Sequence, residues 1–163
     1  MAELVFWSKV YYAVCAICFG IWVLYHIIHA LTHQKVLKAL GYDKPWMAWI
    51  PYVNNYAYAD CVAGKKEKIV MWNLFSVPAV IYKLWWLVRL MSHILYVFGI
   101  VSLSERTLAF IAMGIKVVFL GSVYAKMFAM LDGKEERKEQ VLGCISGTWS
   151  IVAVVKFLTI KRK

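Results

Sequence analysis

The most constraining feature of this sequence is a set of long apolar stretches separated by short basic segments. The first runs from about residue 4 to residue 31 and contains few polar side chains. A helix needs about 20 apolar residues to cross the hydrocarbon core of a bilayer, so this stretch is long enough to span a membrane. Further apolar stretches cover about residues 69–103, 107–131 and 141–160. The sequence therefore predicts an all-α integral membrane protein, with residues 1–163 forming a single membrane domain.

The composition of the chain agrees with this class. Hydrophobic residues make up 63% of the chain, whereas soluble domains contain about 45–50% apolar residues. The net charge is +10, but most of the basic residues flank apolar stretches, where they orient membrane helices and contact anionic lipid headgroups. Because the chain has no basic face and no nucleic-acid recognition motif, nucleic acid is not an expected partner.

The stretch at residues 69–103 leaves the number of crossings open. It is too long for one perpendicular span and contains Pro78, so it forms either one helix kinked at this proline or two short spans. These alternatives give four or five transmembrane helices, and we expect about four. Six lysines at residues 32–68 and three basic residues at the C-terminus favour the cytoplasmic side for both regions. That arrangement requires an odd number of crossings, so four spans leave the sidedness of the termini unresolved.

Residues 32–64 contain an aromatic segment that prolines interrupt. Pro45 and Pro51 lack a backbone N–H and disfavour helix in the residue before them, so no helix runs through the segment. Tryptophan and tyrosine rings have apolar bodies and polar tips, which is typical of a membrane–water boundary. We expect an interfacial or re-entrant segment. Its boundary residues are Trp46, Trp49, Pro51, Asn54 and Asn55.

The motif Trp46-x-Ala48-x-Ile50-Pro51-x-x-Asn54 lies inside this segment, between Gly41 and Gly64. It resembles a motif in small bacterial multi-pass membrane proteins of unknown function, and the resemblance covers about residues 38–64. The resemblance implies a bacterial plasma membrane as the location, and it implies no activity.

Lys116 is the most costly residue of the predicted spans. A lysine at the centre of a membrane helix costs about 2.5–3.5 kcal/mol and usually faces a cavity or a partner. One hypothesis is an anion or lipid-phosphate site, with Lys83, Arg89 or Lys156 assisting. The alternative is a lysine whose flexible stem reaches the bilayer surface. An ion pair would need Asp60, Glu105 or another subunit.

Gly143 and Gly147, four residues apart and followed by Ser150, form a face of small residues. Such faces allow helix backbones to approach closely in lipid. The sequence leaves two alternatives open, namely association with another subunit and packing within the same chain.

Redox chemistry is the main alternative function. Cys15 and Cys18 form a Cys-x-x-Cys pair like that of four-helix membrane thiol oxidoreductases, and His26, His29 and His93 offer axial ligands for a haem. Each set also has an ordinary explanation. The cysteines would be small residues in a membrane core, and the histidines would be amphipathic residues at the membrane interface. No His-Glu-x-x-His motif occurs, and we expect no metal and no cofactor.

The leading hypothesis is a non-enzymatic multi-pass membrane protein. It would act as an oligomeric pore or transport subunit, or as a component of a membrane complex, and would interact with anions or lipids. The expected partners are the lipid bilayer, anionic headgroups, and either further copies of the chain or another membrane protein. The predicted membrane helices from residue 69 onward contain no acidic residue. Because cation-coupled carriers commonly use buried Asp or Glu, this argues against such a carrier.

Overall fold

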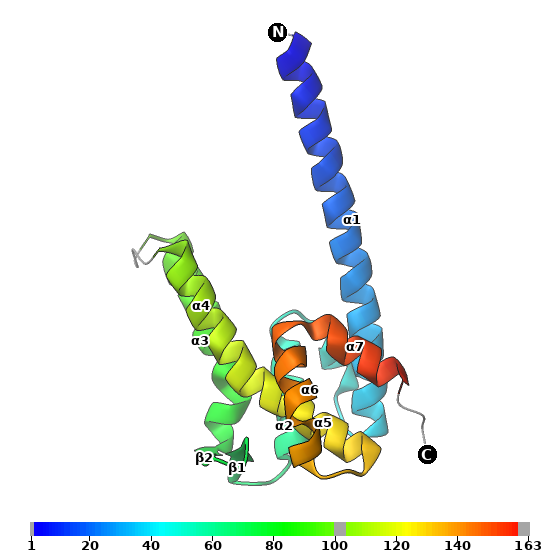
Figure 1. Ribbon diagram of the computed structural model, residues 1–163, viewed down its shortest axis with the longest axis vertical. Helices are drawn as coiled ribbons and strands as arrows, with labels where there is room; N and C mark the ends of the chain where they lie inside the picture. Colours follow the sequence, from blue (N-terminus) through cyan, green and yellow to red (C-terminus); the bar gives the residue numbers. More distant parts are fainter. Residues whose placement is uncertain (1, 100–103, 160–163) are drawn as a thin grey trace.

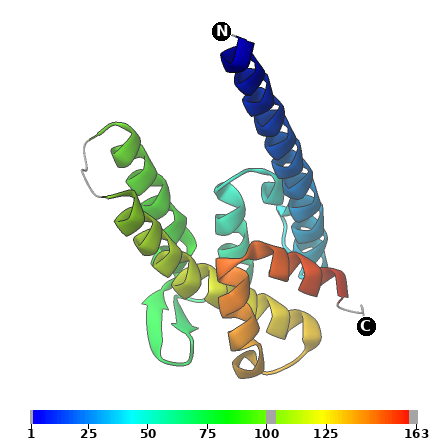
Figure 2. The ribbon, with the colours of Figure 1, turned by 45° about the horizontal axis from the view of Figure 1, so that its top comes forward.

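The computed structural model describes residues 2–99 and 104–159, which form a mostly helical structure (Figure 1). The elements, in chain order, are α1 (Ala2–Ala39), the 3-10 helix η1 (Pro45–Trp49), α2 (Val53–Ala63), β1 (Lys68–Met71), β2 (Phe75–Pro78), α3 (Ala79–Val97), α4 (Glu105–Ile115), the π-helical turn η2 (Lys116–Leu120), α5 (Gly121–Asp132), α6 (Glu136–Thr148) and α7 (Ser150–Thr159). Two arms project in the same direction from a base (Figure 1 and Figure 2). One arm is the N-terminal part of α1, and the other is the hairpin of α3 and α4.

Three helices of the described residues are long and apolar enough to cross a membrane, by length and composition. They are Phe6–Ala39, Ala79–Val97 and Arg106–Asp132. The helical class is therefore confirmed, and the first and third helices match the stretches predicted at residues 4–31 and 107–131. The sequence predicted about four spans, and the two other predicted stretches differ from the structure.

The stretch at residues 69–103 begins with a β hairpin rather than a helix. Strands β1 and β2 pair antiparallel from Lys68 opposite Pro78 to Met71 opposite Phe75. Pro78 precedes the first turn of α3, where its missing N–H costs no helical hydrogen bond. Both a kink at Pro78 and a second span within this stretch are therefore wrong for the described residues, because α3 runs unbroken from residue 79 to 97. Residues 100–103 lie outside the described part of the chain.

The stretch at residues 141–160 is also not a single span. It is divided between α6 and α7, and the chain changes direction at Trp149, whose backbone is extended (φ −121°, ψ 94°). The ten residues of α7 rise only about 15 Å, about half the thickness of the hydrocarbon core. Residue 160 lies beyond the described residues.

Helix α1 has an exposed part and a buried part. At 1.5 Å per residue its 38 residues extend about 57 Å, well beyond the ~30 Å hydrocarbon core. Among the side chains of α1 that the structure describes, the buried ones lie from His29 onward, whereas large apolar side chains nearer the N-terminus, such as Trp7 and Phe19, are exposed. The N-terminal part is therefore an apolar arm, and residues 29–39 belong to the base.

The core of the base is aromatic. The largest side chains that are fully or almost fully buried are Trp85, Tyr58, Tyr82, Tyr124 and Phe128. They come from α2, the first turns of α3, and α5, so elements far apart in sequence meet here. The ring of Phe157 in α7 packs edge-on against Phe128, with ring centroids 5.0 Å apart. Burying rings of this size is the main favourable contribution to the stability of the base.

The small-residue face of α6 packs within the chain. A Cβ atom added at Gly143 would lie 2.5 Å from the backbone oxygen of Gly121 and 2.7 Å from Cβ of Ala125. A Cβ at Gly147 would lie 2.8 Å from the backbone nitrogen of Gly121 and 3.0 Å from the backbone oxygen of Lys116. The glycines therefore bring α6 into backbone contact with η2 and α5, and of the two alternatives they serve internal packing.

We predict that Gly147→Ala, and likewise Gly143→Ala, lowers the free energy of unfolding in detergent. The added methyl group forces two helix backbones apart, and overpacking of this kind costs about 1–3 kcal/mol. Gly114→Ala in α4 is the control, because no atom lies within 4 Å of its added Cβ and alanine favours helix. Thermal unfolding measures both effects. Unchanged stability of both α6 variants, or a loss that depends on protein concentration, would contradict internal packing.

Candidate functional site

Lys116 lies where the arms meet the base. It is the first residue of the π-helical turn η2, within the continuous helix Arg106–Asp132. Single π-helical turns inside α-helices are rare and occur frequently at functional sites. The half-buried Lys116 lines two cavities, one apolar and one polar, and these cavities are therefore adjacent.

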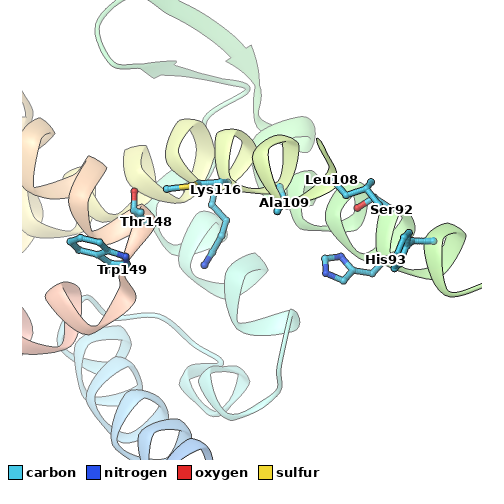
Figure 3. A pocket seen from close by; sticks show the side chains of 10 residues that line it. Ser92, His93, Leu108, Ala109, Lys116, Thr148 and Trp149 are labelled. Carbon is cyan, nitrogen blue, oxygen red and sulfur yellow. The ribbon is translucent and has the colours of Figure 1, made fainter. Parts of the chain in front are cut away.

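The apolar cavity, here called the hairpin cavity, has a volume of about 560 Å³. It lies between α3, α4 and the corner that joins α6 to α7. Its lining is Ser92, His93, Tyr96, Leu108, Ala109, Ala112, Met113, Lys116, Thr148 and Trp149. Figure 3 shows the Lys116 side chain extending from its helix into the space between Trp149 and His93.

The polar cavity is smaller, at about 260 Å³. It lies between α1, the turn that precedes α2, and the helix that contains η2. Its lining is Trp22, Tyr25, His26, His29, Pro51, Tyr52, Asn54, Asn55, Lys116, Leu120, Tyr124 and Ser150. Among the described residues that line the two cavities, none is Asp or Glu. A lysine, three imidazoles and two amides without a carboxylate make an environment that favours an anion.

The other lysines proposed for this site do not line either cavity. Lys83 forms an ion pair with Asp60 (2.6 Å), and Lys156 forms one with Asp132 (2.9 Å). Asp60, one of the two acids suggested as a partner for Lys116, is thus bound by Lys83. Arg89 lies in α3, and its side chain is not among those described. Of the predicted set Lys116, Lys83 and Arg89, Lys116 is the member that the described side chains place at the cavities.

Hydrogen bonds hold the walls of the polar cavity. The Tyr25 hydroxyl lies 2.5 Å from Oγ of Ser150, which joins α1 to α7. Nδ1–H of His33 donates to the backbone oxygen of His29 (2.8 Å), because a carbonyl only accepts. Nε2 of the same ring lies 3.1 Å from the Tyr124 hydroxyl in α5. Ser150, proposed as part of an oligomer interface, instead bonds within the chain.

The π-helical turn is braced from two sides. Nε1–H of Trp72, at the tip of the β hairpin, donates to the backbone oxygen of Val118 (2.9 Å). Gly147 of α6 packs against the backbone oxygen of Lys116 from another direction. These contacts fix the helix segment that positions the lysine side chain.

The aromatic segment packs along the lower part of α1. The indole Nε1–H of Trp49 donates to Oε1 of Gln34 (3.1 Å), and Nε2–H of His26 donates to the backbone oxygen of Trp49 (3.2 Å). Trp46 is 54% exposed. The predicted break of the helix at the prolines is confirmed, since the 3-10 helix η1 and α2 are separate. A position at the bilayer surface stays a prediction.

The structure separates the residues of the redox alternative. Cys15 and Cys18 are exposed thiols on the arm of α1, whereas Cys61 and Cys144 lie in α2 and α6. Within residues 2–99 and 104–159, no group of three or more His, Cys, Asp or Glu side chains is arranged to hold a metal ion. His26 and His29 line the polar cavity and His93 lines the hairpin cavity.

Comparison of the chain with protein-family models, with curated proteins and with solved structures gave no match.

We predict that the thiol of Cys61 reacts slowly at neutral pH. Burial, aided by the neighbouring charge of Asp60, raises the pKa of Cys61 from 9.0 to about 11. Because the thiolate is the reactive form, alkylation at pH 8 should be about 100-fold slower than for an unshifted thiol. In a variant with Cys15, Cys18 and Cys144 replaced by alanine, the iodoacetamide rate should keep rising through pH 10. A rate that is half-maximal near pH 9 and levels off above pH 10, as for a free thiol measured in parallel, would contradict this.

Proposed function

We propose that the protein is a non-enzymatic multi-pass membrane protein that acts as a component of a membrane complex and interacts with anions or anionic lipids at Lys116. The observation that carries the proposal is the solitary arm of α1. In the described structure α3 and α4 lie side by side, whereas the N-terminal part of α1 has no helix beside it (Figure 1 and Figure 2). The partner is a further copy of this chain or another membrane protein.

The surface of this arm suits contact with another helix. Ala16 and Gly20 are exposed and four residues apart, and small residues at this spacing let a second backbone approach closely in lipid. Apart from the backbone of α1 itself, no described atom lies within 4 Å of a Cβ added at Gly20, so the described part of the chain does not cover this surface. The α6 glycines, which sequence analysis offered as the association face, are occupied inside the base.

We also propose three crossings, with the N-terminus outside and the base at the cytoplasmic surface. Both arms extend from the same side of the base, so the chain would cross through α1, return through α3 and cross again through the continuous helix Arg106–Asp132, whose first part is α4. This odd number lets the basic region at residues 32–68 and the C-terminal helices share one side, as the charge distribution requires. The exposed side of the short helix α7 is apolar, through Ile151, Val155 and Leu158, which suits contact with the membrane surface.

The topology predicts a labelling pattern for single cysteines in a variant that lacks the four native ones. In intact cells a membrane-impermeant maleimide should label Glu3→Cys and should not reach Lys66→Cys or Lys134→Cys. The latter two should react only after permeabilisation. Labelling of Lys66→Cys in intact cells would contradict a cytoplasmic base.

The assembly predicts a mass above that of one chain for the detergent-solubilised protein. Gly20→Ile should lower this mass, because the branched side chain blocks close helix approach, and should leave thermal unfolding of the base unchanged. Gly114→Ile is the matched control on the other arm, where the chain also leaves open space, and should keep the assembly. Light scattering measures the mass. A parent protein that is a stable monomer with no co-purifying partner would contradict membership of a complex.

A further inference from the structure

We propose that the two cavities that share Lys116 bind one anionic phospholipid, with its phosphate in the polar cavity and an acyl chain in the hairpin cavity. This inference rests on the proposed function, because it needs the arms to lie in a bilayer, and it names the ligand of the same site. The ligand is amphipathic because the two cavities differ in character and meet at one lysine.

The polar cavity has the groups that a phosphate needs. Lys116 supplies a cation, while the side-chain amides of Asn54 and Asn55 supply N–H groups around the same space. Carboxylates are missing from its described lining, so none repels a phosphate there. Asp60 and Asp132, which do not line this cavity, form ion pairs with Lys83 and Lys156. Charge complementarity therefore favours an anionic headgroup over a cationic one.

The hairpin cavity has the volume and the apolar lining that a lipid chain needs. Along α4 and into η2 its lining runs from Leu108 to Lys116, which corresponds to about 12 Å along the helix axis. Ala109, Ala112 and Met113 give this wall a small and apolar surface. The cavity thus begins at the cation, near the base, and continues along the arm toward the interior of the membrane. A phospholipid of the cytoplasmic leaflet would have the same orientation.

Native mass spectrometry of the detergent-solubilised full-length protein tests this assignment. Phosphatidic acid should bind at least about tenfold more tightly than phosphatidylcholine, and Lys116→Gln should weaken its binding by about tenfold or more, as expected for loss of one charge-assisted hydrogen bond. Lys116→Arg should restore binding. Lys9→Gln removes an exposed lysine of α1, away from both cavities, and should leave phosphatidic acid binding unchanged.

A second pair of variants tests the acyl-chain part. Ala109→Trp fills the hairpin cavity. It should weaken the binding of long-chain phosphatidic acid and leave the binding of inorganic phosphate unchanged. Ile111→Trp places the same ring at an exposed position of α4 outside the cavity lining and should change neither. Thermal unfolding of each variant confirms that the fold is kept.

Three results would overturn the inference. They are equal binding of phosphatidic acid by the parent and by a folded Lys116→Gln variant, binding that does not depend on chain length, and inorganic phosphate that binds as tightly as the lipid. The last two would assign the site to a free anion. None of these results alters the mass of the assembly, so failure of the lipid site is distinguishable from failure of the proposed membrane complex.

Discussion

The structure depends on backbone contact between α6 and the helix that contains η2 and α5. Gly143 and Gly147 allow this contact because a methyl group at either position would overlap the backbone around Gly121. Without it, α6 would sit farther from α5 and the corner at Trp149 would move with it. That corner carries α7, whose Ser150 bonds Tyr25 of α1. One close helix contact thus couples the C-terminal helices to the first helix of the chain.

The same contact positions the candidate site. Gly147 packs against the backbone oxygen of Lys116, and Trp72 of the β hairpin donates to the backbone oxygen of Val118 two residues later. The π-helical turn between them is therefore held by both the C-terminal part of the chain and the hairpin. Its lysine side chain lies at the meeting point of a polar and an apolar cavity. The arms beyond this point make no comparable contacts with each other in the described structure, which leaves their apolar surfaces exposed.

Hydropathy predicted what depends on local composition and missed what depends on long-range contact. The long apolar runs of α1 and of residues 107–131 identified two of the three candidate spans, and the prolines identified the break around η1. The hairpin at residues 68–78 was missed because its strands are apolar and continuous with α3, so β-branched residues such as Ile69 and Val70 looked like part of a helix. The start of α6 was also missed, because the helix begins at Glu136, before the apolar stretch at residues 141–160. Its charged Glu139 is buried there because it pairs with Lys134 and Lys156. Lys116 was found by its cost in a membrane, whereas Tyr25 and Tyr124 carry no sequence signal that places them at one cavity.

The central claim is that lipid surrounds the N-terminal part of α1 while the part from His29 onward belongs to a base outside the hydrocarbon. Spin labels placed one at a time along α1 in liposomes test it most directly, through collisions with oxygen, which partitions into lipid, and with a water-soluble nickel complex. The account predicts high oxygen and low nickel collision rates between about Val10 and Trp22, low rates for both at the buried Leu37, and high nickel rates at the exposed Lys38. Nickel collision rates as high between Val10 and Trp22 as at Lys38 would contradict it.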